Sequence, residues 1–219
     1  MPKDNPYKGN IAADTIEVRF AFSGKVARIL KKPGDRVRAG ELLASLETKV
    51  LQAELDKELA DYERVRAEFE IFAVKVRDPQ TDIEKFEKTR MQSLLNAAVK
   101  AVELAKYRMD QTTLSSPVEG IVVSDDGLRP GLYITPGSYG FAIIDFATLH
   151  FELEVPWSEI GNFAEGAQVK ILLSGKEGEY PGQVLSPLPN LKNNTCLVRI
   201  RLEKTDGLWP GMPGEASLP

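Results

Sequence analysis

Two glycine-free stretches of the chain repeat apolar residues with the period of a helix. In residues 82–111 the apolar positions lie alternately four and three residues apart, at Met91, Leu95, Ala98, Val102, Ala105 and Met109, with Thr112 next in line. In residues 48–77 another set recurs every seven residues, at Leu55, Tyr62, Phe69 and Val76. Leu59 and Ala73 occupy the complementary positions of that stretch, although Arg66 interrupts their line. This heptad spacing predicts two helices that pack through one coiled-coil seam.

A short break separates the two predicted helices. Asp78-Pro79-Gln80 interrupts the heptads, because proline does not continue a helix, and Thr81-x-x-Glu84 has the form of a capping box at the start of the second helix. The segment 48–111 is therefore predicted to be an antiparallel helical hairpin with its tip near residues 77–82. About thirty residues per arm, at 1.5 Å each, give an arm length of about 45 Å.

The segments on either side of this hairpin contain an internal repeat. A proline-glycine pair, an apolar residue and a second glycine follow with the same gaps in both segments, as Pro33-Gly34, Val37, Gly40 and as Pro130-Gly131, Ile134, Gly137. Farther along, Leu43 and Leu46 correspond to Gly140 and Ile143. Because proline fixes a turn and glycine permits positive φ, each copy is predicted to form short strands joined by tight turns. Two such units can form a small two-fold sandwich together; the alternative is that these residues are ordinary turn signals.

From residue 148 onward, short runs alternate apolar and polar positions. The apolar faces of two such runs are Phe151, Leu153, Val155 and Cys196, Val198, Ile200, Leu202. Alternation with a period of two is typical of strands that bury one face. Short strands at this density predict a small β-barrel over residues 148–219, because closure protects the strand edges.

Composition narrows the possible functions. The 219 residues carry 28 basic and 32 acidic side chains, and the resulting net charge of -4 disfavours a nucleic-acid binder. One cysteine, Cys196, and one histidine, His150, disfavour a disulfide, a zinc site and histidine-based catalysis. No uninterrupted apolar run reaches the roughly 18 residues of a membrane span. We therefore expect a soluble chain that is not an enzyme and has no catalytic, cofactor-binding or metal-binding residues.

Four motifs along the chain follow one another in an order known from one protein family. They are Phe22-x-Gly24-x-Val26, Pro33-Gly34-Asp35-x-Val37-x-x-Gly40, Thr113-x-x-Ser116-Pro117-x-x-Gly120 and Pro210-Gly211-Met212. Their order, with the hairpin between them, resembles the bacterial membrane fusion proteins, or periplasmic adaptor subunits, of the hemolysin-secretion-D type. The resemblance implies a mainly β fold with a long α-helical hairpin. Residues 11–47 and 112–147 would form the halves of a lipoyl/biotinyl-like β-sandwich, interrupted by the coiled-coil hairpin 48–111 and followed by the β-barrel 148–219.

The resemblance also implies a function and partners. Proteins of this family link an inner-membrane transporter, which is an ABC or a proton-driven pump, to an outer-membrane channel or another partner in the cell envelope. They serve the export of drugs, small molecules or proteins, and they assemble into homo-oligomeric rings. We therefore expect a periplasmic or extracytoplasmic adaptor that associates with the membrane through a segment absent from this chain. No nucleic acid and no cofactor is implied.

The hairpin tip is the expected partner-binding site. Many adaptors resemble one another in an arginine, a leucine four residues later and a serine seven residues after that. Alignment at the tip places Glu70, Val74 and Thr81 at these positions, and the glutamate reverses the charge, which argues against the usual outer-membrane channel. The residues expected to contact the partner are Glu70, Phe72, Val74, Arg77, Asp78, Gln80 and Thr81.

Two other functions are compatible with parts of the sequence. Glu47-Thr48-Lys49-Val50 resembles the modified-lysine turn of biotin and lipoyl carrier domains, although a long helix is predicted directly after Lys49. A structural coiled-coil protein would use the hairpin only for self-association. Ile71 and Phe72 supply more apolar surface near the tip than a two-helix seam requires. That surface either packs against Ile83 and Phe86 of the second helix or contacts a partner.

Overall fold

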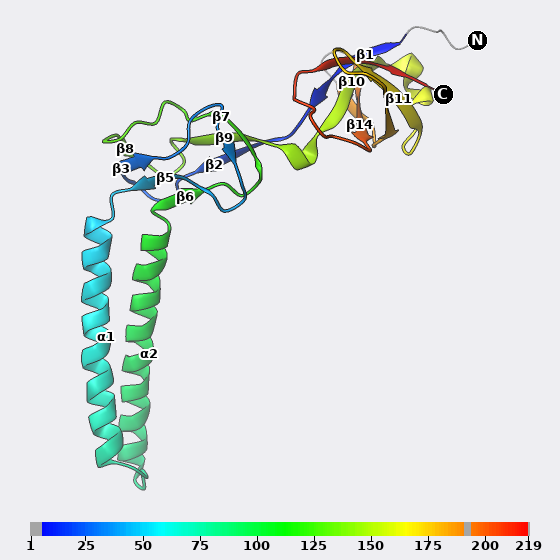
Figure 1. The fold of residues 1–219 in the computed structure, drawn as a ribbon. Coiled ribbons are helices and arrows are strands. Elements are labelled where there is room, and N and C mark those ends of the chain that lie inside the picture. The colour runs from blue at the N-terminus through cyan, green and yellow to red at the C-terminus, as the bar shows by residue number, and fades with distance from the viewer. Residues whose placement is uncertain (1–5, 191–193, 219) are drawn as a thin grey trace. The chain divides into compact units, whose positions relative to one another are not determined.

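The computed structural model describes residues 6–190 and 194–218. The chain divides into two compact units, and the division passes through three of the strands of the β repeat. One unit contains the barrel, and the other, residues 17–117 and 122–142, contains the hairpin and most of the β repeat. The predicted fold class, mainly β with one long helical hairpin, is confirmed (Figure 1).

The barrel is a closed sheet of six strands with a seventh strand at its side. Its strands are β1 (Tyr7–Ala12), β10 (His150–Pro156), β11 (Gln168–Leu173), β12 (Glu179–Val184), β13 (Leu188–Asn190), β14 (Thr195–Leu202) and β15 (Pro213–Ser217). The order is β10-β1-β15-β11-β12-β14-β13, and the additional pairing of β10 with β14 closes the ring. Phe151, Leu153 and Val155 alternate into the core with Val198 and Ile200, as the sequence predicts. Two short 3-10 helices, η1 (Phe146–Thr148) and η2 (Trp157–Asn162), flank β10.

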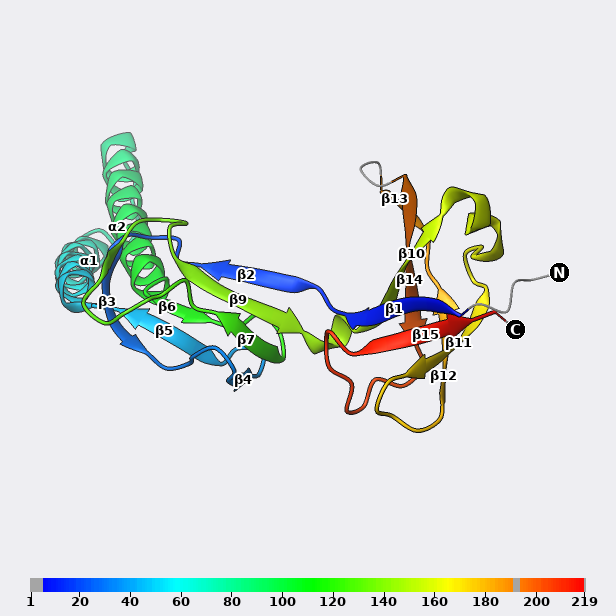
Figure 2. The same cartoon turned by 90° about the horizontal axis from the view of Figure 1, so that it is seen from above.

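The first barrel strand comes from the other end of the chain. The domain division expected from the sequence assigns Ile11 to the lipoyl-like half, but β1 pairs with both β10 and β15 (Figure 2). Ile11 lies opposite Phe151 in this pairing and is completely buried in the barrel core. Without β1 the strands β10 and β15 would each expose an unpaired edge, so the barrel closes only with this strand. The other boundaries of the three-part division remain predictions.

The β repeat forms two sheets of four strands. The strands are β2 (Thr15–Arg19), β3 (Gly24–Ile29), β4 (Arg36–Val37), β5 (Leu42–Leu46), β6 (Thr113–Ser115), β7 (Gly120–Ser124), β8 (Tyr133–Ile134) and β9 (Gly140–Asp145). Their orders are β2-β9-β7-β4 and β6-β5-β3-β8. Each sheet therefore combines strands that precede and follow the hairpin.

Backbone hydrogen bonds show that the two copies of the repeat exchange equivalent contacts. Gly34 N donates to the carbonyl of Val122 over 2.8 Å, and Gly131 N donates to the carbonyl of Val26 over 2.8 Å. Both glycines have positive φ, +96° and +90°, which favours glycine at these turns. The repeated residues thus occupy equivalent places, and coincidental turn signals do not explain them.

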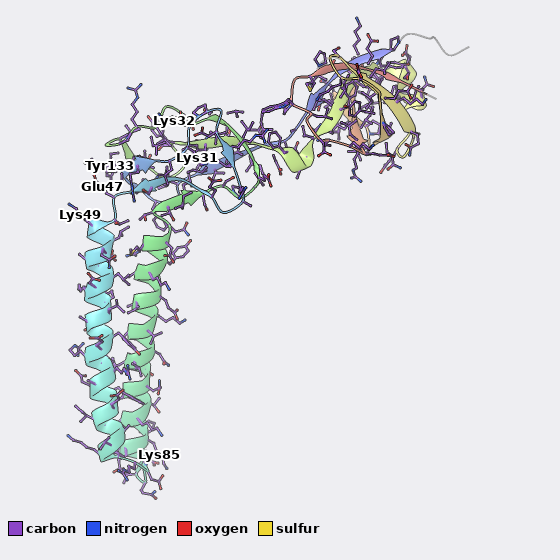
Figure 3. All side chains as sticks on the ribbon, viewed as in Figure 1. Lys31, Lys32, Glu47, Lys49, Lys85 and Tyr133 are labelled. Atoms are coloured by element: carbon purple, nitrogen blue, oxygen red, sulfur yellow. The ribbon has the colours of Figure 1, made fainter. Side chains whose placement is uncertain are left out.

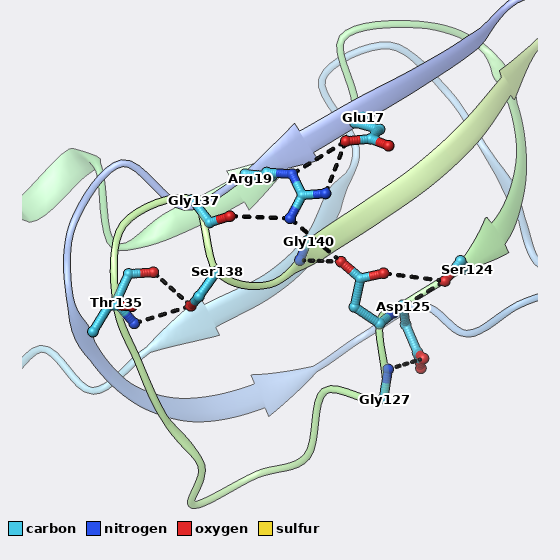
Figure 4. A network of polar contacts seen from close by, with 10 residues as sticks. Glu17, Arg19, Ser124, Asp125, Gly127, Thr135, Gly137, Ser138 and Gly140 are labelled. Atoms are coloured by element: carbon cyan, nitrogen blue, oxygen red, sulfur yellow. Dashed lines mark hydrogen bonds and ion pairs between the residues drawn. The ribbon is translucent and has the colours of Figure 1, made fainter.

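Polar contacts around Arg19 link three segments of the β repeat (Figure 4). Arg19 on β2 binds the carboxylate of Glu17 at 2.8 Å and donates to the carbonyl of Gly137 at 3.0 Å. Its guanidinium also lies 3.7 Å from Asp126, whose carboxylate accepts from the amide of Gly140 at 3.1 Å and from the hydroxyl of Ser124 at 3.4 Å. These contacts fix the turns that precede and follow β8.

The hairpin consists of α1 (Lys49–Lys75) and α2 (Asp82–Asp110), which extend away from β3, β5 and β6 of the same unit (Figure 1). The 29 residues of α2 give it a length of about 43 Å. All the seam residues predicted for α2 are buried or half-buried, so the coiled-coil prediction is confirmed for this helix.

The seam of α1 differs from the prediction in one of its two lines. The predicted line of Leu59, Arg66 and Ala73 is exposed, and the line of Glu58, Val65 and Phe72 faces α2 instead. Both lines fit the spacing, because residues three and four positions beyond Leu55 lie on adjacent parts of the helix. The structure buries the line with the larger apolar side chains, and Val65 is the most buried residue of α1.

Candidate partner-binding site at the hairpin tip

The turn at the hairpin tip is fixed by the cap of α2. Thr81 Oγ1 accepts a hydrogen bond from the amide of Glu84 at 3.3 Å, and Glu84 Oε2 accepts from the amide of Thr81 at 3.0 Å. The predicted capping box is therefore confirmed. Glu84 also accepts from the amide of Gln80 at 2.9 Å, and Gln80 Nε2 donates to Asp78 Oδ2 at 2.6 Å. These hydrogen bonds thus hold the turn between the two helices in a defined conformation.

The same hydrogen bonds make the cap sensitive to acid. The backbone amides of Thr81 and Gln80 stabilise the ionised carboxylate, so the pKa of Glu84 lies below its usual value. Because the pKa of Glu84 is lower in the folded state, the cap stabilises the hairpin fully at pH values above the ordinary glutamate pKa of about 4.3. The contribution is lost as the pH falls through the lowered pKa.

A Glu84→Ala variant is expected to show this pH dependence directly. Its melting temperature should lie below that of the unsubstituted chain by a constant amount above about pH 5, because the carboxylate is ionised there. The difference should disappear in stronger acid, where both chains lack the charged cap. Thermal unfolding followed by circular dichroism at a series of pH values measures it, and a difference that persists unchanged in acid would contradict this account of the cap.

The structure places most of the predicted contact residues on the outside of the tip. Arg77, Asp78, Gln80 and Thr81 are exposed within the turn. Glu70 is exposed one turn before the end of α1 and forms an ion pair with Arg66 at 2.8 Å, which raises the pKa of that guanidinium. Phe72 differs from the others because it is half-buried in the seam with α2.

Four exposed apolar side chains surround the tip, and we call them the apolar tip residues. They are Ile71, Val74, Ile83 and Phe86, with 55%, 69%, 81% and 74% of their surface accessible. Each lies within four residues of a helix end, which is about 6 Å along the axis. Ile71, Ile83 and Phe86 are too exposed to cover one another, so the alternative in which Ile83 and Phe86 cover the apolar side chains of α1 is wrong for Ile71, whereas Phe72 is half-buried. Exposed apolar groups gathered in one place are typical of a surface that contacts a partner.

Ile71, Ile83 and Phe86 are not among the contact residues predicted from the sequence. Ile83 lies one position and Phe86 four positions into α2, and neither belongs to the Met91–Leu95–Ala98 seam. Their departure from the heptad pattern was the available signal. The heptad pattern shows only that Ile83 and Phe86 lie off the seam. The structure shows in addition that no other part of the described chain covers them.

Lys49 does not lie in a tight turn between two strands. It is the first residue of α1, and β5 ends three residues earlier at Leu46 (Figure 3). Glu47, which precedes it, forms an ion pair with Lys25 at 2.9 Å. This geometry does not support the biotin or lipoyl carrier alternative, since a carrier presents its lysine at the end of a hairpin.

The described residues form neither a metal cluster nor a helix that could span a membrane. Within residues 6–190 and 194–218, no group of three or more His, Cys, Asp or Glu side chains is placed to hold a metal ion. Of the helices in these ranges, none combines the length and the apolar character that crossing a membrane requires.

Comparison with known sequences finds distant relatives. No family model matches the chain. The uncharacterized protein YdhJ of Escherichia coli strain K12 is 23% identical over 189 residues, covering 81% of this chain and 66% of YdhJ. The nickel-cobalt-cadmium resistance protein NccB of Alcaligenes xylosoxydans is 27% identical over 201 residues, covering 84% of this chain and 48% of NccB. The chain therefore spans about two thirds and about half of these relatives.

Solved structures resemble the chain over nearly its full length. The membrane fusion protein Spr0693 of Streptococcus pneumoniae R6 has a TM-score of 0.78 at 16% identity, covering 96% of this chain and 97% of that one. A MacA–MexA chimera that contains the α-hairpin of Pseudomonas aeruginosa MexA also has a TM-score of 0.78, at 20% identity, covering 97% and 79%. The chain has the fold of the membrane fusion proteins, as the order of its motifs predicts.

Proposed function

We propose that the chain is a periplasmic adaptor that links an inner-membrane transporter to an exit channel or another envelope partner. The observation that carries the proposal is the hairpin tip, where a capped turn holds Ile71, Val74, Ile83 and Phe86 in water. Fully burying a large apolar side chain is favourable by roughly 1.5–3 kcal/mol of free energy, which each of the four exposed side chains forgoes. A partner that covers them would regain part of that free energy.

The charges at the tip favour a selective contact. Arg77, Asp78 and Glu70 surround the apolar tip residues, and all three are exposed. Charged groups at the rim of an interface select the partner and guide its approach, while the apolar centre provides the affinity. Because Arg66 already neutralises part of the charge of Glu70, we propose a channel or envelope partner with a mixed rather than a strongly basic docking surface.

The likeness to membrane fusion proteins supports the remaining parts of the proposal. Several copies would form a ring in which the lipoyl-like unit and the barrel of each copy contact the neighbouring copies. Each contact would be weak, and the binding of all copies to one transporter would hold the ring together. The site of action would be periplasmic or extracytoplasmic. The cargo would be a drug, another small molecule or a protein, and no residue of the chain would catalyse a reaction on it.

Crosslinking in intact membranes tests the proposed function. The full-length protein, expressed in its own host, is crosslinked, solubilised and captured, and the associated proteins are identified by mass spectrometry. Recovery of an inner-membrane transporter supports the proposal. Recovery of biotin-dependent or lipoyl-dependent enzymes in its place, together with a mass increase located at Lys49, would overturn it.

A further inference from the structure

The two copies of the β repeat carry charges of opposite sign. In the first copy, residues 28–41 contain five basic and two acidic side chains, a net charge of +3 in a chain whose total is -4. The corresponding residues 124–138 of the second copy contain one basic and two acidic side chains. We call the five cations of the first copy the basic loop residues: Arg28, Lys31, Lys32, Arg36 and Arg38.

The fold of the repeat does not require these cations. In the first copy the amide of Arg38 donates to the carboxylate of Glu41 at 2.8 Å. At the equivalent turn of the second copy, the amide of Thr135 donates to the hydroxyl of Ser138 at 3.1 Å. Uncharged side chains therefore form the same turn, and the difference between the copies shows that the positive charge of the first one serves something other than folding.

The basic loop residues extend into water. Residues 32–36 are all exposed, and so are Arg28 and Arg38 on either side of them. Lys31 is half-buried and forms an ion pair with Glu41; Lys31 and Lys32 both lie in the β repeat (Figure 3). Within residues 6–190 and 194–218, neither Arg28 nor Lys32 forms an ion pair, so the chain leaves these charges available to an anionic partner.

Two exposed leucines lie among the basic loop residues. Leu30 and Leu42 are 49% and 45% exposed. The amide of Leu30 donates at 2.7 Å to the carbonyl of Leu43, the residue after Leu42, so the two leucines belong to neighbouring segments. Cations beside exposed apolar side chains are typical of a surface that contacts an anionic bilayer. There the cations meet the headgroups, and the apolar groups enter the boundary between headgroups and acyl chains.

We propose that the basic loop residues, together with Leu30 and Leu42, bind the surface of a membrane that contains anionic lipids. The phosphate groups of the lipids would pair with Arg28 and Lys32, and the two leucines would leave water at the same time. A fluid bilayer accepts an extended loop without a matching cavity, whereas an acidic protein would have to supply one. The contact uses the β repeat alone and does not depend on the proposed adaptor function.

Sedimentation with lipid vesicles tests the contact. The purified chain is mixed with phosphatidylcholine vesicles that contain about 30% phosphatidylglycerol or none, and the partition coefficient is obtained from the pelleted fraction. We expect binding to the anionic vesicles only, and at least a tenfold loss of binding between about 0.1 M and about 0.5 M salt, because salt screens the charges. Equal binding to neutral vesicles, binding that salt does not weaken, or no binding at all would overturn the proposal.

The second copy of the repeat supplies a matched control. Lys32 and Arg129 occupy equivalent positions before the proline-glycine pair, and both are exposed. Lys32→Glu should lower the partition coefficient at least about fivefold, since it removes one cation from the contact and adds a carboxylate. Arg129→Glu changes the net charge of the chain by the same amount and should change the partition coefficient by less than about twofold. Equal effects of the two substitutions would show that the loop is not the contact.

A fluorescent label at Leu30 distinguishes a bilayer from an acidic protein. Cys196 is the only cysteine and is buried, so a Cys196→Ala background allows one labelled position at a time. An environment-sensitive dye on Leu30→Cys should shift to shorter wavelength when anionic vesicles are added. The same dye on Val123→Cys, which is 44% exposed in the second copy, should not shift.

Polyglutamate serves as the probe for an acidic protein. A dye at Leu30→Cys that responds to polyglutamate but not to anionic vesicles would reject the membrane contact in favour of an acidic protein partner. A shift of equal size at Val123→Cys would show that the chain meets the bilayer without a preferred surface, which also contradicts the proposal. Neither result depends on whether a transporter is captured by crosslinking, so this contact and the proposed function can fail separately.

Discussion

Replacing Val74 with aspartate is expected to abolish export while leaving the thermal stability of the protein nearly unchanged. Val74 is 69% exposed and lies outside the seam, so the folded hairpin loses no packing. In a docked tip, however, the new carboxylate would have to leave water without a partner, which is costly. We expect at least a tenfold loss of export, since a residue at the centre of an interface contributes roughly 2 kcal/mol or more and each 1.4 kcal/mol is tenfold.

The other end of the same helix supplies a matched control. Val50 is 80% exposed and lies in the first turn of α1, at the end of the helix opposite the tip. Val50→Asp should therefore export normally, with the same helix content as Val74→Asp. Export assays in a strain that lacks the natural copy of the gene provide the measurement, and circular dichroism provides the check on folding.

The tip is not the docking surface if export survives the change at Val74 together with Glu70→Arg. The hairpin would then act as a spacer or as a self-association arm. Phe86→Asp distinguishes a tip-wide contact from one confined to α1. Phe86 lies on the other helix of the tip and is 74% exposed, so it should behave like Val74 if the partner covers both helices.

The sequence predicted the hairpin well because its helices satisfy strong local rules. The cap formed by Thr81 and Glu84 depends on residues three apart, and the seam of α2 depends on neighbours along one helix. The second seam line of α1 was predicted wrongly because the heptad spacing is compatible with two different lines of residues. Glu58, Val65 and Phe72 fit the heptads as well as Leu59, Arg66 and Ala73 do. Burying Val65 and Phe72 removes more apolar surface from water than burying Leu59 and Ala73 beside a charged arginine, which favours the first set.

Features that depend on distant parts of the chain were harder to predict. The short strand β1 is stabilised by partners more than 130 residues away, such as Leu153 opposite Gly9, and its own alternation is weak. The same limit applied at the tip. The spacing of Ile83 and Phe86 excludes them from the seam, but only the three-dimensional structure shows whether another part of the chain covers them.

The internal repeat was visible in the sequence, and the structure explains the place at which its two copies differ. Leu43 of the first copy is completely buried, and its counterpart is Gly140. A Cβ atom on Gly140 would collide with the carbonyl oxygen of Val18 on the neighbouring strand β2. The amide of Gly140 is also held by Asp126, which lies beside Arg19 in the polar contacts of Figure 4. Close approach of two backbones therefore requires glycine in the second copy.

Restoring the repeat by Gly140→Leu is accordingly expected to destabilise the β unit by about 3 kcal/mol or more, because β2 and β9 must separate to admit the side chain. Thermal unfolding compared with the unsubstituted chain measures the loss. Val123→Leu is the control, since Val123 on the adjacent strand β7 is 44% exposed and can grow outward into water. If Gly140→Leu unfolds at the same temperature as this control, the two backbones do not approach as closely as the structure places them, and the difference between the two copies has another cause.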